Sequence, residues 1–591
     1  MRTRRFTDLA HTAPFSSLLW VFGAWLVVPS LIAATPAPAG LNPRVAAALE
    51  YISSSWAVLT RSMSECKTVY DPKSPGGSTL YFPTDFPIPA PIANLKRSCP
   101  VDIRHLPHVI HHLGQGEVSK VHPQGLLYLP HSYVVPGGMF NEMYGWDSYF
   151  ILRGLLKAGR LNLARGMVEN FFFEIGHYGA ILNANRTYHM TRSQPPFLSE
   201  MVRAVYDAEQ ARGENGRAWL REAYPFVART EEFWTHAPNL AGSTGLSRYF
   251  DLGQGPAPEL GSSSDDYYRQ VASYFLTHPA SAGGYLIWTR PKHQASAPVG
   301  SPVGPLFPAY LCNPSGHSAA QGLPRAGCAR AGSAALSRAF YKGDRSLRES
   351  GFDITFKFGP FGAGTPDYAP VGLNSLLYRE ETDLEWMSRR LGKSADAAKW
   401  RARADQRRHE ITTYFWNPER GLFFDYNFKA GAQSDYVYAT TFYPLWVGAA
   451  SAGQAQATVG NLPIFDEPGG IVMSRETTGG QWDYPYGWAP LQLIAVEALR
   501  RYGDNTDANL VSARFLSMLT DNFARDHTLY EKYNVVTRSS ETRVRVGYTK
   551  NQVGFGWTNG VFVTLFDDLP ASWRARLGQS RELIGASATA K

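Results

Sequence analysis

Apolar side chains recur every three or four residues over much of this chain, which is the spacing of helices that bury one face. Between Ser394 and Trp416 the apolar positions are Ala397, Trp400, Ala404, Ile411 and Phe415, and Ser394 is a good N-cap. Asn42 can likewise cap a helix that has Pro43 in its first turn and runs to about Cys66. The pattern predicts further helices over Leu161–Ile175, Pro195–Arg212, Gly216–Trp234, Leu373–Leu391, Trp488–Tyr502 and Asn505–Arg525.

Alternating strand patterns are few, so the sequence predicts an all-α fold without a large sheet. Many helices joined by loops of variable length fit either a helical solenoid or a closed helical toroid. A solenoid requires a repeated unit of fixed length, and the sequence contains none. The toroid is therefore the favoured architecture.

The first 39 residues have the layout of a secretory signal peptide. Arg2, Arg4 and Arg5 precede a mostly apolar run over Leu18–Ala34, and small residues follow. An uncleaved membrane anchor is the alternative, but Pro29 interrupts the run. We expect an exported protein, periplasmic or secreted, with a catalytic domain over residues 40–575 and a C-terminal tail over 576–591. Elsewhere no stretch has the ~20 apolar residues of a membrane helix.

Four cysteines, an even number, indicate two disulfides in an exported chain. Three pairings are possible, and proximity favours Cys66–Cys99 and Cys312–Cys328. Metal binding by these cysteines is the less favoured alternative, because no Cys-x-x-Cys or paired histidines accompany them. The later pair lies in His293–Ser337, a segment rich in Ala, Gly, Pro and Ser. We interpret it as an insertion that either covers the site or forms a surface loop.

Composition excludes some classes of function. The 591 residues are 44% hydrophobic and 18% charged, as in globular proteins. The net charge of +8 is spread along the helices without a dense basic cluster, which argues against nucleic acid as a partner. Aromatic residues reach 13%, which suits either a large core or a carbohydrate cleft.

Two segments concentrate aromatic rings and acidic groups. Val134–Phe150 contains a Pro-Gly-Gly turn, which Gly permits because it tolerates positive φ. The rings and carboxylates after this turn are Phe140, Glu142, Tyr144, Trp146, Asp147 and Tyr149. The second segment is Gln481–Pro490. Rings beside hydrogen-bond acceptors suit a sugar, which has an apolar C–H face and a rim of hydroxyls. A turn that leads into a buried aromatic helix is the simpler alternative.

These two segments closely resemble the signatures of the trehalase family, glycoside hydrolase family 37. Cys66–Pro72, Arg192–Pro196 and Trp557–Gly560 also resemble family segments, so the likeness extends from about Cys66 to Phe566. The resemblance implies an (α/α)6 toroid of six outer and six inner helices with the site at one end. It further implies hydrolysis of α,α-trehalose to glucose with inversion, without a metal or an organic cofactor.

The resemblance also assigns the reacting groups. Glu349–Asp353 is similar to the segment of the family's general acid, with Phe352 in place of Trp, and implies that Asp353 is the acid. Tyr530–Tyr533 is similar to the segment of the general base and implies Glu531. Inversion needs a water between the base and the anomeric carbon, so these carboxyls should lie ~6.5–9.5 Å apart. The implied substrate-binding residues are Phe140, Trp146, Asp147, Asn183, Arg192, Ser193, Gln194, Glu259, Gly351 and Trp482.

Three positions depart from the family pattern. Met139 and Ala257 stand where the family has arginines, and Tyr548 stands near the place of a sugar-binding glutamate. Each lost charged group removes roughly 1.5–3 kcal/mol of hydrogen bonding to the sugar unless another replaces it. Two other functions therefore stay open, an inverting hydrolase of a different α-glucoside and a non-catalytic sugar-binding protein. We expect a monomer with a small sugar as its partner and no stable membrane partner once the leader is removed.

Overall fold

The computed structural model describes residues 41–71, 77–115, 121–289, 307–312 and 328–577, with the backbone alone at 262, 288–289, 307–312 and 328–332. The predicted leader over residues 1–39 lies outside this part. The described helices are α1 Pro43–Leu59, α2 Cys66–Val69, α3 Ala90–Leu95, α4 Asp147–Lys157, α5 Leu161–His177, α6 Leu198–Ala211, α7 Arg217–Trp234, α8 Ser264–Thr277, α9 Pro279–Ala282, α10 Arg338–Glu349, α11 Val371–Leu391, α12 Ser394–Phe415, α13 Tyr443–Val447, α14 Ala452–Gly460, α15 Ala489–Arg501, α16 Asn505–Asp526, α17 Gly556–Asp568 and α18 Ala571–Arg574.

Every helix predicted from the apolar spacing is present, and the ends shift by at most three residues except at the C-terminal end of α1. The Asn42 side chain accepts a hydrogen bond from the Arg44 N–H at 2.9 Å, so the predicted cap is confirmed. Helix α1 ends at Leu59 and not near Cys66, because the next two residues form strand β1. Ser394 is the first residue of α12 and not its N-cap, which is Lys393.

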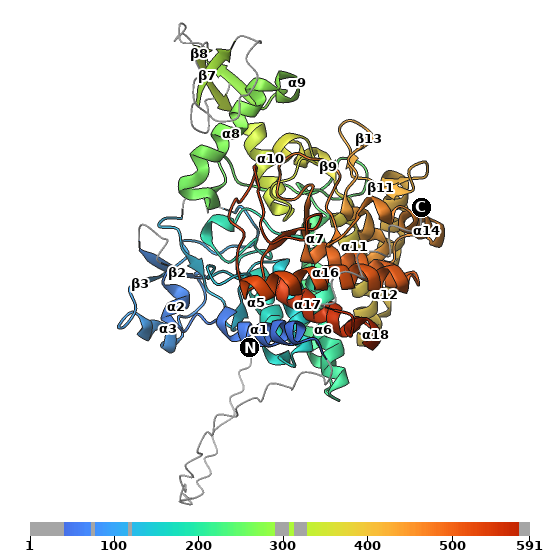
Figure 1. The fold of residues 1–591 in the computed structure, drawn as a ribbon. Helices are drawn as coiled ribbons and strands as arrows, with labels where there is room; N and C mark the ends of the chain where they lie inside the picture. Colours follow the sequence, from blue (N-terminus) through green and yellow to red (C-terminus); the bar gives the residue numbers. More distant parts are fainter. Residues whose placement is uncertain (1–40, 72–76, 116–120, 290–306, 313–327, 578–591) are drawn as a thin grey trace, which may run out of the picture. The chain divides into compact units, whose positions relative to one another are not determined.

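Six helices that are not consecutive along the chain form a closed inner ring. In order around the ring, α4 packs on α6, α6 on α11, α11 on α13, α13 on α15, α15 on α17, and α17 again on α4. The outer helices α5, α7, α12, α14 and α16 each follow one of the first five inner helices, and α1 lies against α16 and α17. Figure 1 shows the red α17 beside the blue α1. Among the described residues, the first and last parts of the chain therefore close the ring.

The connections at the two ends of the helices differ in length. Inner helices lead into the next outer helix through short turns, at residues 158–160, 212–216, 392–393, 448–451 and 502–504. The return connections are long, at residues 178–197, 235–370, 416–442, 461–488 and 527–555. All of these long connections reach the N-terminal end of an inner helix, so the segments able to build a site gather at that end.

Strands in the described part form only sheets of two or three. They are β1 Thr60–Arg61, β2 Ser78–Phe82, β3 Val101–His105, β4 Leu126–Leu127, β5 Tyr133–Val134, β6 Leu286–Thr289, β7 Phe307–Cys312, β8 Cys328–Leu336, β9 Tyr368–Ala369, β10 Trp416–Asn417, β11 Leu422–Phe423, β12 Tyr426–Asn427, β13 Ala432–Gln433, β14 Asp466–Glu467, β15 Gly470–Ile471, β16 Tyr486–Trp488 and β17 Lys532–Asn534. The β3-β2-β4 sheet is parallel, with Leu80 opposite Ile103 and Leu126.

The expected insertion contributes strands β7 and β8, which pair with β6 in the order β6-β8-β7. The backbone register sets Cys312 opposite Cys328, but their side chains lie outside the described part, so the second predicted disulfide stays a prediction. The first, Cys66–Cys99, is present.

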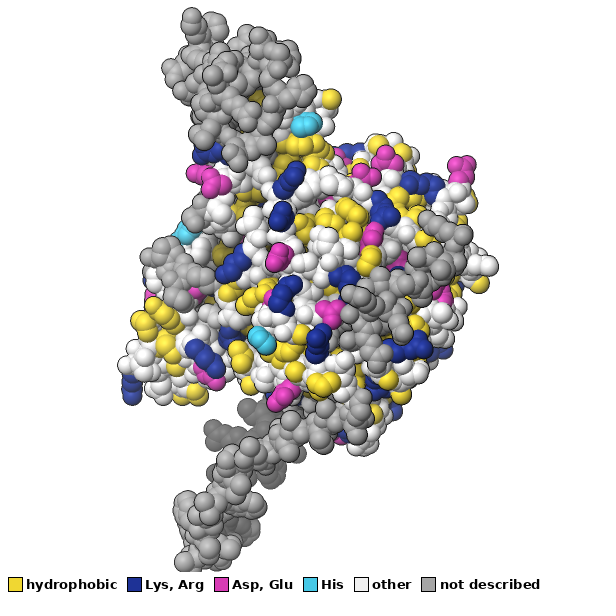
Figure 2. All heavy atoms as spheres, in the orientation of Figure 1, with side chains coloured by type: hydrophobic (Ala, Val, Ile, Leu, Met, Phe, Trp, Pro, Cys, Tyr) yellow, Lys and Arg dark blue, Asp and Glu magenta, His cyan; other side chains and the backbone are white. Residues whose placement is uncertain are grey.

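The visible face of the molecule carries charges of both signs. Figure 2 shows Lys and Arg side chains interspersed with Asp and Glu over the visible face. No helix in the described part is both long enough and apolar enough to cross a membrane.

Candidate active site

A cavity of about 540 Å³ opens at the N-terminal ends of the inner helices. Asp147 is the first residue of α4, Trp488 precedes α15, and Trp557 lies in the first turn of α17. Gln194 comes from the long connection before α6. All four residues line the cavity, so segments as far apart in sequence as Asp147 and Trp557 build one site.

Four tryptophans form an aromatic wall of this cavity. Trp482 and Trp488 stack with ring centroids 3.8 Å apart and planes only 5° apart. Trp146 lies 5.8 Å from Trp482, and Trp557 lies 5.7 Å from both Trp146 and Trp488. All four are at most 4% exposed and line the cavity. Such a rigid apolar surface suits the C–H face of a sugar ring.

Asp353 lies in this cavity at the end of a buried turn. Gly351 has φ of 77°, and a Cβ there would come within 2.8 Å of the Trp146 ring, so only glycine fits. The side chain of Gln481 donates a hydrogen bond to the backbone carbonyl of Asp353. Burial raises the pKa of Asp353 to about 6, although the guanidinium of Arg348, 3.7 Å away, opposes the shift. The carboxyl is therefore able to hold a proton in mildly acidic solution.

Glu531 reaches the same cavity from a different connection, the one before α17. The ammonium of Lys532 lies 2.9 Å from its Oε2 atom, and Lys532 itself is fully buried. The indole N–H of Trp557 donates to the Glu531 carbonyl at 3.0 Å. The ion pair therefore holds the Glu531 carboxylate in a fixed position at the cavity.

Asp147 is a third carboxyl group in the cavity. It is 5% exposed, and burial raises its pKa to about 8, with smaller contributions from the nearby charges of Glu531 and Asp353. These contributions indicate that Asp147 lies within electrostatic range of both carboxyls. A neutral Asp147 can donate a hydrogen bond to a sugar hydroxyl as well as accept one.

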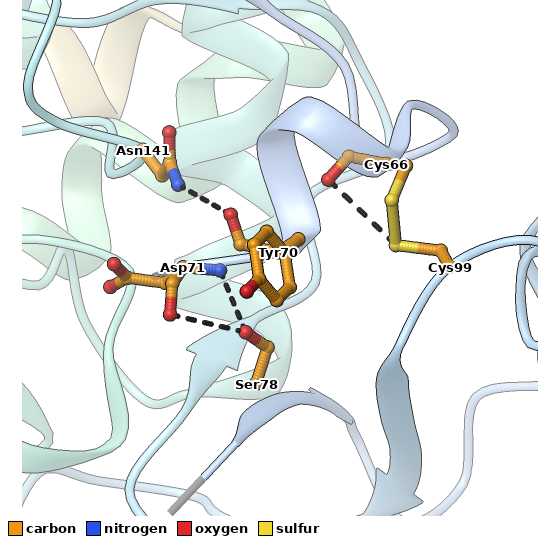
Figure 3. The surroundings of a disulfide bond; sticks show 6 residues. All are labelled: Cys66, Tyr70, Asp71, Ser78, Cys99 and Asn141. Carbon is orange, nitrogen blue, oxygen red and sulfur yellow. Dashed lines mark hydrogen bonds between the residues drawn. A yellow bond between two sulfur atoms is a disulfide. The ribbon is translucent and has the colours of Figure 1, made fainter. Parts of the chain in front are cut away.

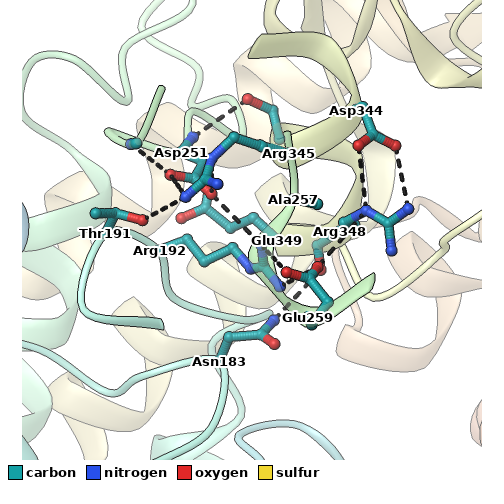
Figure 4. Close-up of polar contacts among 12 residues, drawn as sticks. Asn183, Thr191, Arg192, Asp251, Ala257, Glu259, Asp344, Arg345, Arg348 and Glu349 are labelled. Carbon is teal, nitrogen blue, oxygen red and sulfur yellow. Dashed lines mark hydrogen bonds and ion pairs between the residues drawn. The ribbon is translucent and has the colours of Figure 1, made fainter. Parts of the chain in front are cut away.

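A network of buried ion pairs surrounds Glu259 (Figure 4). Arg192 pairs with Glu259 at 2.6 Å, and Arg348 lies 3.6 Å from the same carboxylate. Arg348 is also bound by Asp344, the residue one turn earlier in α10, at 3.2 Å. Burial alone would raise the pKa of Glu259, but Arg192 and Arg348 outweigh it and hold the pKa below its usual range. Glu259 is therefore an anionic hydrogen-bond acceptor in the cavity.

The structure brings together the two predicted reacting residues and nearly all of the predicted binding residues. The cavity is lined by Phe140, Trp146, Asp147, Asn183, Arg192, Gln194, Glu259, Gly351, Asp353, Trp482 and Glu531. Ser193 does not line it. Its N–H donates instead to the buried carboxyl of Glu349 at 2.9 Å, so Ser193 ties the Arg192 segment to α10.

The three departures from the family pattern occupy different environments. Met139 and Tyr548 line the cavity and are 44% and 40% exposed. The Tyr548 hydroxyl accepts a hydrogen bond from Arg348 at 3.0 Å. Ala257 is 1% exposed and does not line the cavity. Only two of the three departures therefore face the space in which a ligand would bind.

Sequence reasoning missed Arg348 and His189, which also line the cavity. Arg348 lies in α10, five residues before Asp353, and its position next to a proposed catalytic acid was a usable signal. His189 lies in the connection before α6, close to Arg192, and nothing in its local sequence marks it as a site residue.

An ion-paired group of Asp71, Glu142 and Arg186 also lines the cavity, and the Cys66–Cys99 disulfide lies close to Asp71 in sequence. Arg186 bridges the carboxylates of Asp71 and Glu142, and all three line the cavity. Figure 3 shows Asp71 a few residues after the Cys66–Cys99 bond, with its backbone held by Ser78. The disulfide therefore anchors the segment that brings Asp71 to the site. Within the described residues, no group of three His, Cys, Asp or Glu side chains is arranged to hold a metal ion.

Comparison with known proteins identifies the family. The family model described as Trehalase matches residues 96–278 and 327–570. Cytosolic neutral trehalase of Saccharomyces cerevisiae is 36% identical over 76% of this chain and 58% of its own length. The protein of the same name from Neurospora crassa is 34% identical over 76% of this chain and 59% of its own length. The chain thus spans less than two thirds of these relatives.

The structure of neutral trehalase Nth1 from Saccharomyces cerevisiae superposes with a TM-score of 0.72 at 31% identity, over 92% of this chain and 97% of that chain. The predicted export, periplasmic or secreted, is wrong, because the two relatives found by sequence comparison, from Saccharomyces cerevisiae and Neurospora crassa, are named cytosolic. The prediction of a signal peptide rested only on the order of basic, apolar and small residues at the N-terminus. Residues 1–39 lie outside the described part.

The closed ring of inner helices and the superposition confirm the predicted (α/α)6 toroid. The family match covers both aromatic segments and the segments that carry Asp353 and Glu531. The chain belongs to the trehalase family of glycoside hydrolases.

Proposed function

We propose that this protein hydrolyses α,α-trehalose to two glucose molecules with inversion at the attacked carbon, with Asp353 as general acid and Glu531 as general base. The observation that carries the proposal is that both carboxyl groups line one cavity and that burial raises the pKa of Asp353 to about 6. Family membership and the names of the relatives support trehalose as the substrate.

In the proposed reaction, Glu531 removes a proton from a water molecule as the water oxygen bonds to the anomeric carbon. The bond from that carbon to the bridging oxygen breaks, and Asp353 protonates the departing oxygen. Attack opposite the leaving group inverts the configuration. We expect the two carboxyls to stand ~6.5–9.5 Å apart when substrate is bound.

The remaining cavity residues have roles that follow from their chemistry. One glucosyl ring would rest on the tryptophan wall, with Asn183, Gln194 and the neutral Asp147 bound to its hydroxyls. The departing glucose would contact Glu259 and Arg348, which form an ion pair, and Arg348 in turn lies next to Asp353. Charged partners make the stronger hydrogen bonds to hydroxyls, so this pair would dominate recognition of the second ring.

The direct test is a trehalose assay in which NMR identifies the first-formed anomers of glucose. An inverting enzyme that hydrolyses α,α-trehalose gives one α- and one β-glucose per turnover. Asp353→Asn and Glu531→Gln should each lower kcat at least 10³-fold while circular dichroism and Tm stay near wild type. Near-normal turnover by either variant would overturn the assignment of that residue.

A second candidate, hydrolysis of another α-glucoside, is favoured by one observation. Met139 and Tyr548 are partly exposed side chains that line the cavity, and they stand where the resemblance to the family implies charged groups that bind the sugar. Assaying glucose release from trehalose and from a panel of α-glucosides separates the candidates. Turnover of another α-glucoside without trehalose turnover would favour the second. Sugar binding without any turnover would indicate a non-catalytic binding protein.

A further inference from the structure

Four residues that line the cavity form a closed ring of contacts around the proposed acid. The Nη1 atom of Arg348 lies 3.7 Å from the Asp353 carboxylate and donates a hydrogen bond to the Tyr548 hydroxyl at 3.0 Å. The Tyr548 N–H donates to the Gln481 side chain at 3.2 Å, and the Gln481 amide group donates to the Asp353 carbonyl. Gln481 therefore fixes the Tyr548 segment and the Asp353 backbone relative to each other.

The Nη1 atom of Arg348 faces two oxygen acceptors but is hydrogen-bonded to only one of them. An N–H···O hydrogen bond spans about 2.7–3.2 Å, so the contact with Tyr548 is a hydrogen bond and the longer contact with Asp353 is not. The Nε and Nη2 atoms of the guanidinium donate to Asp344 at 3.3 and 3.2 Å (Figure 4). Asp344 thus holds one edge of the guanidinium, and Tyr548 holds the Nη1 end that points to the acid.

The charges that face Asp353 determine how readily its carboxyl keeps a proton. The titratable and charged groups within range are Arg348 from α10, Arg192 and Glu259 from two of the long connections, Asp147 from α4 and Tyr548 from the connection before α17. Among these groups, Arg348 has the largest effect and favours the ionised carboxylate. A direct hydrogen bond from Nη1 would favour the ionised form further, and an ionised Asp353 has no proton for the leaving oxygen.

We propose that Tyr548 is a positioning residue for the acid: its hydroxyl holds the Nη1 end of Arg348 away from the Asp353 carboxylate and thereby keeps that carboxyl able to carry a proton. The inference rests on the proposed function for the role of Asp353, but the restraint on Arg348 does not depend on that role. A phenol suits the task, because it accepts a hydrogen bond from a guanidinium and is itself uncharged at neutral pH.

Tyr548→Phe tests the proposal, because it keeps the ring and removes only the hydroxyl. The side chain is 40% exposed, so Tm should stay near wild type. Nη1 of Arg348 can then donate to Asp353, so the alkaline limb of the kcat/KM profile should move down by about 0.5–1 pH unit. Above the limb, kcat/KM should fall about three- to tenfold in consequence.

The matched control is Tyr502→Phe. The Tyr502 hydroxyl donates to the Ala450 carbonyl at 2.6 Å, and both residues lie in short turns at the end opposite the cavity. This variant therefore also loses one hydroxyl hydrogen bond, but its alkaline limb should stay where wild type has it.

A double variant shows whether the effect passes through Arg348. Tyr548→Phe made in the Arg348→Gln background should leave the limb where Arg348→Gln alone puts it, because no guanidinium remains to approach Asp353. A downward shift that persists in this background would overturn the inference. A limb that is unchanged or raised in Tyr548→Phe with Arg348 present would overturn it as well.

NMR titration of carboxyl-labelled aspartates, with Asp353→Asn to assign the signal, measures the same shift without turnover. A lower pKa of Asp353 in Tyr548→Phe than in wild type is expected, and an equal or higher one would overturn the inference. Near-normal turnover by Asp353→Asn would instead overturn the proposed role of the acid, and the titration would still decide whether Tyr548 restrains Arg348.

Discussion

The guanidinium of Arg348 lies 3.7 Å from the carboxylate of Asp353 and holds its pKa lower than burial alone would. Arg348→Gln should therefore raise the pKa of Asp353, by about 1 unit or more for a charge at this distance. The acid must be protonated in the reaction, so the alkaline limb of the kcat/KM profile, expected near pH 6 in wild type, should move upward.

Arg348→Lys is the control for that shift, because it keeps a positive charge near Asp353. Its alkaline limb should stay within a few tenths of a pH unit of wild type, although KM rises with loss of the planar guanidinium. An alkaline limb that is unchanged or lowered in Arg348→Gln would contradict the assignment of Asp353 as the acid.

Asp147 makes stability depend on pH in a direction that can be measured. Its pKa is raised to about 8 in the folded protein and is about 3.9 in an unfolded chain. The folded state thus binds the proton more tightly, so this contribution to stability is complete below pH 4 and is lost as pH rises through 8. Asp147→Asn removes it, and the variant's Tm relative to wild type should increase steadily from pH 5 to pH 8.5.

The control for Asp147 is Asp396→Asn, in the first turn of α12 at a partly exposed position. Its difference in Tm from wild type should stay constant over the same range. A constant difference for Asp147→Asn as well would show that its carboxyl is ionised in the folded protein at neutral pH.

Restoring an arginine should have opposite outcomes at the two altered positions. Met139→Arg places a guanidinium on an exposed side chain that lines the cavity, so the KM for trehalose should fall about tenfold, the value of one charged hydrogen bond. Ala257 is 1% exposed, and its N–H donates to the Tyr268 hydroxyl at 2.7 Å. Ala257→Arg should therefore lower the free energy of unfolding by about 3 kcal/mol or more.

Kinetics and thermal melts of these two variants separate the effects. Met139→Lys is the control, because it adds a positive charge without the planar guanidinium of arginine. It should lower the KM for trehalose by less than Met139→Arg does. An unchanged KM in Met139→Arg would show that this position does not reach the substrate.

The Cys66–Cys99 bond closes a loop with a sequence separation of 33 residues. Loop-closure entropy predicts that replacing both cysteines by serine lowers the free energy of unfolding by about 3–4 kcal/mol. Urea melts of Cys66→Ser/Cys99→Ser measure this, and reduced wild type is the control, because it should match the variant. The KM for trehalose should rise too, since the bond anchors the segment of Asp71. A variant with wild-type stability would show that the loop is ordered without the bond.

The sequence predicted the outer helices best, for a physical reason. An outer helix has one polar face, so its apolar residues recur at helical spacing. Helices α4 and α17 are buried on nearly all sides, and a segment without a polar face gives no such periodicity. Both of these helices were missed, although the inner helices α6, α11 and α15 were predicted, and with α4 and α17 the contact that closes the ring was missed as well.

The site could be predicted only where a family motif is present. Asp353 and Glu531 carry no chemical signature of their own, and the resemblance selected them. Arg348 was missed because charged residues such as Asp344, Arg345 and Arg348 usually face solvent. Arg345 and Arg348 are in fact buried and paired with Asp251 and Glu259, which lie much earlier in the same connection. No local pattern encodes such pairing.

The short turns of the toroid point to where this protein would tolerate engineering. Gly392, in the turn at residues 392–393, adopts a left-handed conformation and is exposed. A peptide tag or a fluorescent domain spliced in after Gly392 would project from the end opposite the cavity. The toroid would then serve as a one-sided scaffold, able to carry a label or a surface tether without obstructing its ligand.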